Sequence, residues 1–257
     1  MGGTSRFRRL LLAAVLAVTG AVTGAVGQAG ADQQIVGGVR ASIADHSYMV
    51  YLATVDGFQY CGGSLAAENK VITAAHCVVG KKPAEITVVA GREDKQSETG
   101  LIAPVQSLWV HPDYTDVRAG ADVAVLTLGK PVPYQPLAYA GADDTALYEA
   151  GKPGTILGWG RTEAGGEPSR FLLRAEVPLI ADADCTASYS TYDASSMVCA
   201  GLAEGGVDSC QGDSGGPLIV DGTLVGITSW GEGCAAPGKP GVYTRVAAYA
   251  ALLDEQV

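Results

Sequence analysis

The sequence has few positively charged side chains. Its 17 Lys and Arg stand against 27 Asp and Glu, for a formal net charge of −10, and no run of five or six like charges occurs. Because an acidic surface repels a phosphate backbone, we do not expect nucleic acid as a partner. Charged residues make up only 17% of the chain and glycine is abundant, which favours a loop-rich globular protein over a disordered one.

Histidine is also scarce, and no Cys-x-x-Cys pair occurs. The three histidines are His46, His76 and His111. A zinc site is therefore not expected, because such sites draw on clustered Cys and His ligands. All six cysteines lie beyond an N-terminal leader. An even number in an exported chain favours disulfides, although the count alone leaves the pairing open.

Beyond the leader, the sequence lacks an uninterrupted apolar run of about 20 residues, so we expect no membrane span. The leader itself has Arg6, Arg8 and Arg9, then an apolar stretch from Leu10 onward, and small residues at 29–31. This pattern is typical of a secretory signal peptide, here residues 1–31. We therefore expect a secreted, extracellular protein.

Long helical periodicity is missing until the C-terminus. Short β-rich runs recur between Gly, Pro and Asp residues, at 48–54, 71–75, 86–90, 123–128, 155–158, 218–220 and 224–229. Regularly spaced short strands predict an all-β sandwich or barrel. Apolar residues at helical intervals predict one helix near the end of the chain, and the proline-rich segment 130–136 is a candidate linker between two halves.

The segment Gly212-Asp213-Ser214-Gly215-Gly216 is the strongest candidate for chemistry. A serine hydroxyl needs a base to remove its proton and donors to stabilise the oxyanion that forms. Flanking glycines allow a sharp turn whose N–H groups approach a substrate carbonyl. Taken alone, the segment is also compatible with an ordinary glycine-rich turn.

Two further residues supply what such a serine needs. His76, in Thr73-Ala74-Ala75-His76-Cys77, follows an apolar strand and is a candidate general base. Asp122 begins an apolar strand, where its charge is costly to bury unless a group such as an imidazolium pairs with it. Each residue alone is also compatible with a structural role, His76 as an ordinary core or surface histidine and Asp122 as a turn residue.

The order His76, Asp122, Ser214, in these contexts, is similar to that of the trypsin/chymotrypsin family of serine proteases. Further segments carry the resemblance along the chain, namely Ile35–Gly38, Cys61–Leu65, Gly158–Gly160, Asp208–Leu218, Ser229–Gly231 and Pro240–Tyr243. It implies an all-β peptidase domain over residues 35–257, made of two antiparallel six-stranded β-barrels. The expected bounds are about 35–130 and 137–245, with a C-terminal helix at about 246–254.

The resemblance also implies a mechanism. Ser214 would attack the peptide carbonyl, His76 would act as general base and then general acid, and Asp122 would orient His76. The backbone N–H groups of Gly212 and Ser214 would form the oxyanion hole. The expected reaction is hydrolysis of a peptide bond through an acyl-enzyme, without a cofactor.

Substrate specificity is implied at Asp208, six residues before the nucleophile. A carboxylate there would lie at the base of a pocket and select Arg or Lys. The alternative is a turn aspartate in solvent. The other substrate-binding residues that the resemblance implies are Ser209, Gln211, Ser229, Trp230, Gly231 and Gly241.

Activation of a zymogen is implied as well. In the family, cleavage before Ile35 frees an ammonium group that is buried against Asp213. Residues 32–34 would then be a propeptide. Because Gln34, and not Arg or Lys, precedes the cleaved bond, we expect a protease of different specificity as the activator.

The resemblance implies the bridges Cys61–Cys77, Cys185–Cys199 and Cys210–Cys234, a set typical of bacterial members of the family. No metal is expected. The loop at about 91–100 holds acidic residues in a spacing unlike the calcium loop of vertebrate trypsins, and Pro240 replaces the aromatic residue of sodium-activated relatives.

We expect a monomer that cleaves protein or peptide substrates at Arg or Lys, with an activating protease and protein inhibitors as candidate partners. Three alternatives remain. One is a catalytically silent binding protein of the same fold, and another is a peptidase of different specificity. The third is a non-protease hydrolase, whose triad would normally run in the order Ser, Asp, His.

Overall fold

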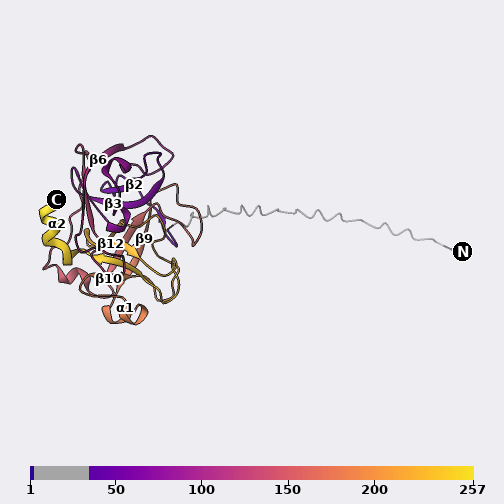
Figure 1. The fold of residues 1–257 in the computed structure, drawn as a ribbon. Helices are drawn as coiled ribbons and strands as arrows, with labels where there is room; N and C mark the ends of the chain where they lie inside the picture. Colours follow the sequence, from indigo (N-terminus) through magenta and orange to yellow (C-terminus); the bar gives the residue numbers. More distant parts are fainter. Residues whose placement is uncertain (3–34) are drawn as a thin grey trace. The chain divides into compact units, whose positions relative to one another are not determined.

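The computed structural model describes residues 1–2 and 35–257 (Figure 1). The expected signal peptide, apart from its first two residues, and the expected propeptide 32–34 lie outside the described residues. Within the described part of the chain, no helix has the length and apolar character needed to cross a membrane.

Six antiparallel strands close the first barrel, in the order β2-β3-β4-β7-β6-β5. Closure pairs the edge strands with each other, so that no backbone edge is left open. The strands are β2 (Met49–Ala53), β3 (Gln59–Ala67), β4 (Lys70–Thr73), β5 (Thr87–Ala90), β6 (Leu101–Val110) and β7 (Ala124–Leu128).

The second barrel has the order β9-β10-β13-β12-β11-β8, and pairing of β8 with β9 closes it. Two six-stranded antiparallel barrels are the fold class expected from the sequence, which is thereby confirmed. The strands are β8 (Pro153–Gly158), β9 (Leu173–Ile180), β10 (Met197–Ala200), β11 (Pro217–Val220), β12 (Thr223–Trp230) and β13 (Gly241–Arg245).

Burial along the strands explains how the barrels form and dock. In β9, buried residues alternate with more exposed ones, as expected for a strand with one face toward the barrel core. All five residues of β2 are buried. One face of β2 fills the first barrel, and the other packs toward the second. There the rings of Tyr51 and Trp159 meet edge to face, with their centroids 5.1 Å apart. The two barrels therefore share an apolar contact, which places their loops side by side.

The start of the described chain differs from the expected barrel bounds. The two-residue strand β1 (Val39–Arg40) pairs with β9 of the second barrel, and Val36 forms an isolated bridge with Asp208. Ile35 is buried in the apolar core of the second barrel. This N-terminal segment therefore lies against the second barrel, although the expected bounds group it with the first.

The helical elements are short. The expected C-terminal helix begins as the 3₁₀ helix η4 and continues as α2 (Figure 1). Leu253 of α2 is buried in the apolar core that includes the first barrel. The sequence analysis did not anticipate α1, which contacts β10. The bounds are η1 (Ala75–Cys77), η2 (Pro83–Glu85), η3 (Thr145–Tyr148), α1 (Asp182–Ser188), η4 (Val246–Tyr249) and α2 (Ala250–Gln256).

Three disulfides join the pairs that the resemblance implies. Cys61–Cys77 ties β3 to the short helix η1, Cys185–Cys199 ties α1 to β10, and Cys210–Cys234 joins two loops of the second barrel. Each bridge restricts the unfolded chain and so stabilises the fold.

Candidate active site

His76 and Asp122 meet at the edge of the first barrel. His76 lies in η1, braced by the Cys61–Cys77 bridge, and Asp122 lies two residues before β7. The Nδ1 atom of His76 lies 2.7 Å from Oδ2 of Asp122, and the His76 backbone N–H donates to Oδ1 at 2.9 Å. Since the carboxylate only accepts, Nδ1 carries the proton and Nε2 is left with a free lone pair.

The Asp122 side chain is 1% exposed, so its charge requires several donors. Besides His76, the hydroxyl of Ser229 donates to Oδ2 at 2.5 Å. The hydroxyl of Thr244 donates to the Asp122 carbonyl at 2.8 Å. Ala121 has a left-handed φ of +55° and donates its N–H to the hydroxyl of Tyr249, which fixes the turn that aims Asp122 inward.

Ser214 lies on a tight turn between the barrels. Its carbonyl accepts a 2.7 Å hydrogen bond from the Gly62 N–H of β3. Glycine is required at Gly215, where φ is +81° and a Cβ atom would lie 2.2 Å from the hydroxyl of Thr73. The turn therefore presses Ser214 against the strands that carry Cys61 and lead to His76.

The Ser214 side chain itself is partly exposed. Among the hydrogen bonds of the described residues, none joins its Oγ to His76. In enzymes without substrate, catalytic hydrogen bonds are often long and tighten only in the complex.

A hollow of about 150 Å³ opens beside Ser214. All seven residues expected to bind substrate line it, together with Cys210, Thr228, Gly233 and Cys234. At Gly241, a Cβ atom would lie 2.7 Å from Oδ1 of Asp208 and would crowd the base of the hollow. At Gly231, a Cβ atom would have only one neighbour within 4 Å, at 4.0 Å. Both glycines thus keep the hollow open.

Asp208 is the charged residue among the described residues that line the hollow, and it is 5% exposed. Its carboxylate accepts the backbone N–H of Ser209 at 2.8 Å and that of Ala235 at 3.1 Å. Burial raises the pKa of Asp208 to about 6, and these two donors oppose the shift. The arrangement is a small hollow with one buried carboxylate in its lining, which suits a cationic side chain.

Sequence reasoning missed several contributors to this site. Ala235 supplies only a backbone N–H, for which no side-chain pattern exists. Tyr243 lies within a segment that carried the resemblance, yet nothing marked its hydroxyl, which lies 3.5 Å from the hydroxyl of Ser209. Ser229 was expected only along the substrate strand, whereas its hydroxyl also binds Asp122.

Asp213 lies behind the Ser214 turn and is 1% exposed. Its carboxylate accepts the backbone N–H groups of Gly160 at 2.7 Å and Cys210 at 3.0 Å. In the described part of the chain Asp213 forms no ion pair, and burial raises its pKa to about 6. A buried carboxylate in this setting would be stabilised by a cation placed against it.

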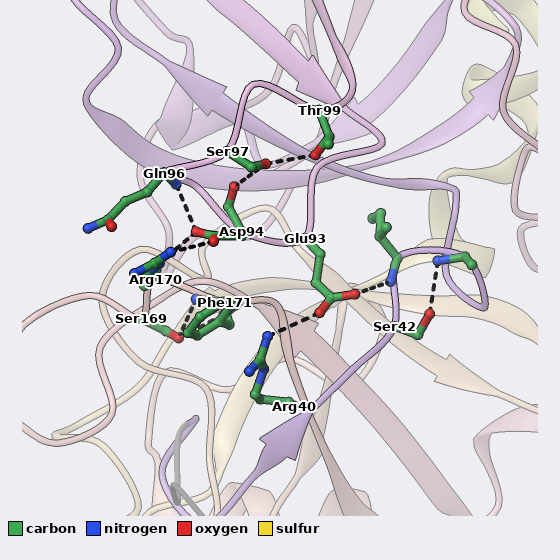
Figure 2. Close-up of polar contacts among 12 residues, drawn as sticks. Arg40, Ser42, Glu93, Asp94, Gln96, Ser97, Thr99, Ser169, Arg170 and Phe171 are labelled. Carbon is green, nitrogen blue, oxygen red and sulfur yellow. Dashed lines mark hydrogen bonds and ion pairs between the residues drawn. The ribbon is translucent and has the colours of Figure 1, made fainter.

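The acidic loop after β5 binds arginine side chains (Figure 2). Asp94 accepts two hydrogen bonds from Arg170, at 2.8 and 2.6 Å, and Arg40 donates to Glu93 at 3.3 Å. The Arg170 contact lowers the pKa of Asp94 to about 2.

Elsewhere, Cys61, His76 and Cys77 cluster, but both sulfurs belong to a disulfide and offer no thiolate to a metal.

Comparison with known proteins identifies relatives over nearly all of the described chain. The trypsin family model matches residues 35–253. A trypsin from Saccharopolyspora erythraea is 54% identical over 87% of this chain and 98% of its own length. The vitellin-degrading protease of Bombyx mori is 40% identical over 88% of this chain and 86% of its own length. Trypsin-1 of Salmo salar is 37% identical over 84% of this chain and 87% of its own length.

The charge of Asp208 should control binding of cations in the hollow. Because its pKa is raised to about 6, protonation below that pH removes the negative charge from the base of the hollow. The affinity for a small arylamidinium, measured by calorimetry, should then fall by about tenfold per pH unit below that value. Affinity that stays constant from pH 7 to 4 would contradict this role for Asp208.

Proposed function

The chain belongs to the trypsin family of serine peptidases, and we propose that it is a secreted endopeptidase that cleaves after Arg or Lys. One observation carries the specificity. The hollow beside Ser214 ends at a buried carboxylate, Asp208, and is kept open by Gly231 and Gly241. A side chain long enough to reach Asp208 and charged at its tip is that of Arg or Lys.

In the proposed reaction, the Ser214 hydroxyl attacks the carbonyl carbon of the residue held in the hollow. His76 Nε2 takes the hydroxyl proton as the new C–O bond forms. The oxyanion accepts hydrogen bonds from the N–H groups of Gly212 and Ser214. Gly212 has a φ of +99°, a conformation that favours glycine.

His76 then gives its proton to the leaving amine as the C–N bond breaks, which leaves an acyl group on Ser214. A water molecule attacks this ester, again with His76 as base, and releases the acid and the free serine. Asp122 holds the proton of His76 on Nδ1 and stabilises the imidazolium formed in each step.

We further propose that the protein is made as a proenzyme with residues 1–31 as signal peptide and 32–34 as propeptide. Ile35 already lies buried in the core of the second barrel, and Asp213 is a buried carboxylate with N–H donors but no ion pair within the described residues. A new ammonium group at Ile35 would supply the cation that this carboxylate calls for. A monomer with an activating protease and protein inhibitors as partners fits this account.

The test of the activity is substitution of the proposed nucleophile. Ser214→Ala should lower kcat for a small arginine ester or amide by at least about 10⁴-fold, because it removes the hydroxyl that forms the acyl-enzyme in the proposed reaction. Ser107→Ala, at an exposed serine of β6, is the matched control. If Ser214→Ala keeps wild-type activity, or if the wild type shows none, the silent binding protein becomes the better account.

The test of specificity is Asp208→Ser. Without the carboxylate, the cationic side chain would be buried unpaired, so kcat/KM for arginine substrates should fall by about 10²- to 10³-fold. Asp143→Ser, at an exposed aspartate, serves as the control. Peptide-library profiling reports the preference directly, and a variant that still prefers basic residues would rule out Asp208 as the determinant.

The activation proposal predicts that mature enzyme does not process its own precursor. Purified full-length protein carrying Ser214→Ala should stay uncut at Gln34–Ile35 when active enzyme is added, because Gln34 cannot reach and neutralise Asp208. N-terminal sequencing detects the new Ile35 terminus. Its release by active enzyme alone would refute the need for a different protease.

A further inference from the structure

A second hollow, of about 450 Å³, lies on the first barrel, away from the one that ends at Asp208. We call it the β3 hollow, because Phe58 and Gln59, at the start of β3, form part of its wall. Among the described residues that line it, the two charged ones are both cations, Arg92 and Lys95, in a protein whose net charge is −10. Around them the wall is largely apolar, and Val55, Phe58 and Ile102 are strongly exposed.

Neither cation forms an ion pair with a carboxylate of the described chain. Lys95 Nζ donates to the side-chain oxygen of Gln59 at 3.0 Å and to the Trp159 carbonyl at 3.5 Å. Arg92 Nε donates to the Thr99 carbonyl at 2.7 Å. These are neutral acceptors, so neither cation has a carboxylate at ion-pair distance within the described residues. Burial lowers the pKa of Lys95 to about 8, and the charge of buried Asp213 opposes this shift.

The two carboxylates that directly precede Lys95 in the loop are each bound by an arginine. Asp94 is held by Arg170 from the second barrel, and Glu93 by Arg40 (Figure 2). The Lys95 backbone N–H also donates to the Arg170 carbonyl at 2.9 Å. These contacts fix the loop and hold Lys95 at the β3 hollow without neutralising it. A cation placed in advance binds an anion with less loss of conformational freedom.

The β3 hollow is connected to the catalytic turn through Gln59. The amide nitrogen of Gln59 donates to the Gly212 carbonyl at 2.7 Å, while its oxygen accepts from Lys95. Gly62, three residues further along β3, donates to the Ser214 carbonyl. Three residues of extended strand span about 10 Å, so the hollow begins at about that distance from the nucleophile.

That position lies on the leaving side of the cleaved bond. In the proposed function, the acyl part of the substrate lies along Ser229–Gly231 and in the hollow at Asp208. An extended substrate that passes Ser214 therefore emerges over the start of β3. At about 3.3 Å per residue, its second to fourth residues after the cleaved bond reach the β3 hollow.

From this geometry we propose that Lys95 and Arg92 form an anion subsite that binds an acidic side chain of the substrate, two to four residues beyond the cleaved bond. The proposal rests on the proposed peptidase function. Its ligand is the carboxylate of Asp or Glu in a polypeptide, with the apolar wall contacting neighbouring residues of the same chain.

The test compares peptides that are identical except for one residue after the cleaved arginine, with Glu or Gln at each of the first four positions. With the activated enzyme at low ionic strength, Glu at one of positions two to four should raise kcat/KM by about threefold to tenfold over Gln. The ratio should shrink as salt is added, because the paired charges are partly exposed.

Lys95→Gln and Arg92→Gln should each reduce this Glu/Gln ratio, and the double variant should bring it close to one. Lys130→Gln removes the same charge from an exposed position and should keep the ratio. The ratio separates the subsite from a general effect of Lys95 on the catalytic turn, since such an effect lowers both rates alike. Arg92 does not contact Gln59 by any hydrogen bond in the described chain and so provides a second, independent variant.

A small arginine amide with no residues after the cleaved bond separates the two proposals. An enzyme that hydrolyses it but shows no Glu preference at any position overturns the anion subsite alone. An enzyme that does not hydrolyse it overturns the proposed function, and the subsite is then decided by calorimetry with Ser214→Ala and the same peptide pairs. Equal affinities for the Glu and Gln peptides overturn the subsite, as does a preference that survives in the double variant.

Discussion

The buried carboxylate of Asp122 is the point on which both the docking of the barrels and the candidate site depend. It comes from the first barrel, just before β7, and binds His76 of the same barrel. From the second barrel, Ser229 of β12 donates to this carboxylate, and Thr244 of β13 donates to the backbone carbonyl of Asp122. A carboxylate that is 1% exposed is tolerated only when hydrogen-bond donors surround it. The carboxylate that orients the imidazole of His76 therefore also requires the two barrels to be docked.

Other aspartates of the chain show how position changes the same carboxylate. Asp208 and Asp213 are buried and accept hydrogen bonds only from uncharged donors among the described residues, and burial raises the pKa of each to about 6. Asp94 is bound by the guanidinium group of Arg170, which lowers its pKa. Asp208 and Asp213 can therefore each bind a further cation. In our proposal, a substrate side chain supplies it at Asp208 and the new N-terminus supplies it at Asp213. Asp94 already has its cation and holds a loop to the second barrel.

Strands with clear apolar runs and turn residues at their ends, such as β5 and β12, could be predicted to within a few residues. Others were not singled out. In β3 the pair Gly62-Gly63 has no side chain to show alternation, and in β9 Arg174, Glu176 and Pro178 interrupt the apolar pattern. The first residues could not be assigned to the correct barrel, because their partner strand β9 lies more than 130 residues away along the chain.

The sequence by itself determined the family, the fold class and seven of the residues that line the hollow at Asp208, since short local motifs carry each of them. Only the tertiary structure decided which groups complete them. The Ala235 N–H at Asp208 and the Ser229 hydroxyl at Asp122 depend on how distant loops and strands meet. The same holds for the cations of the β3 hollow. A charged side chain can form a binding site only where the fold places it beside other groups and partly removes it from water.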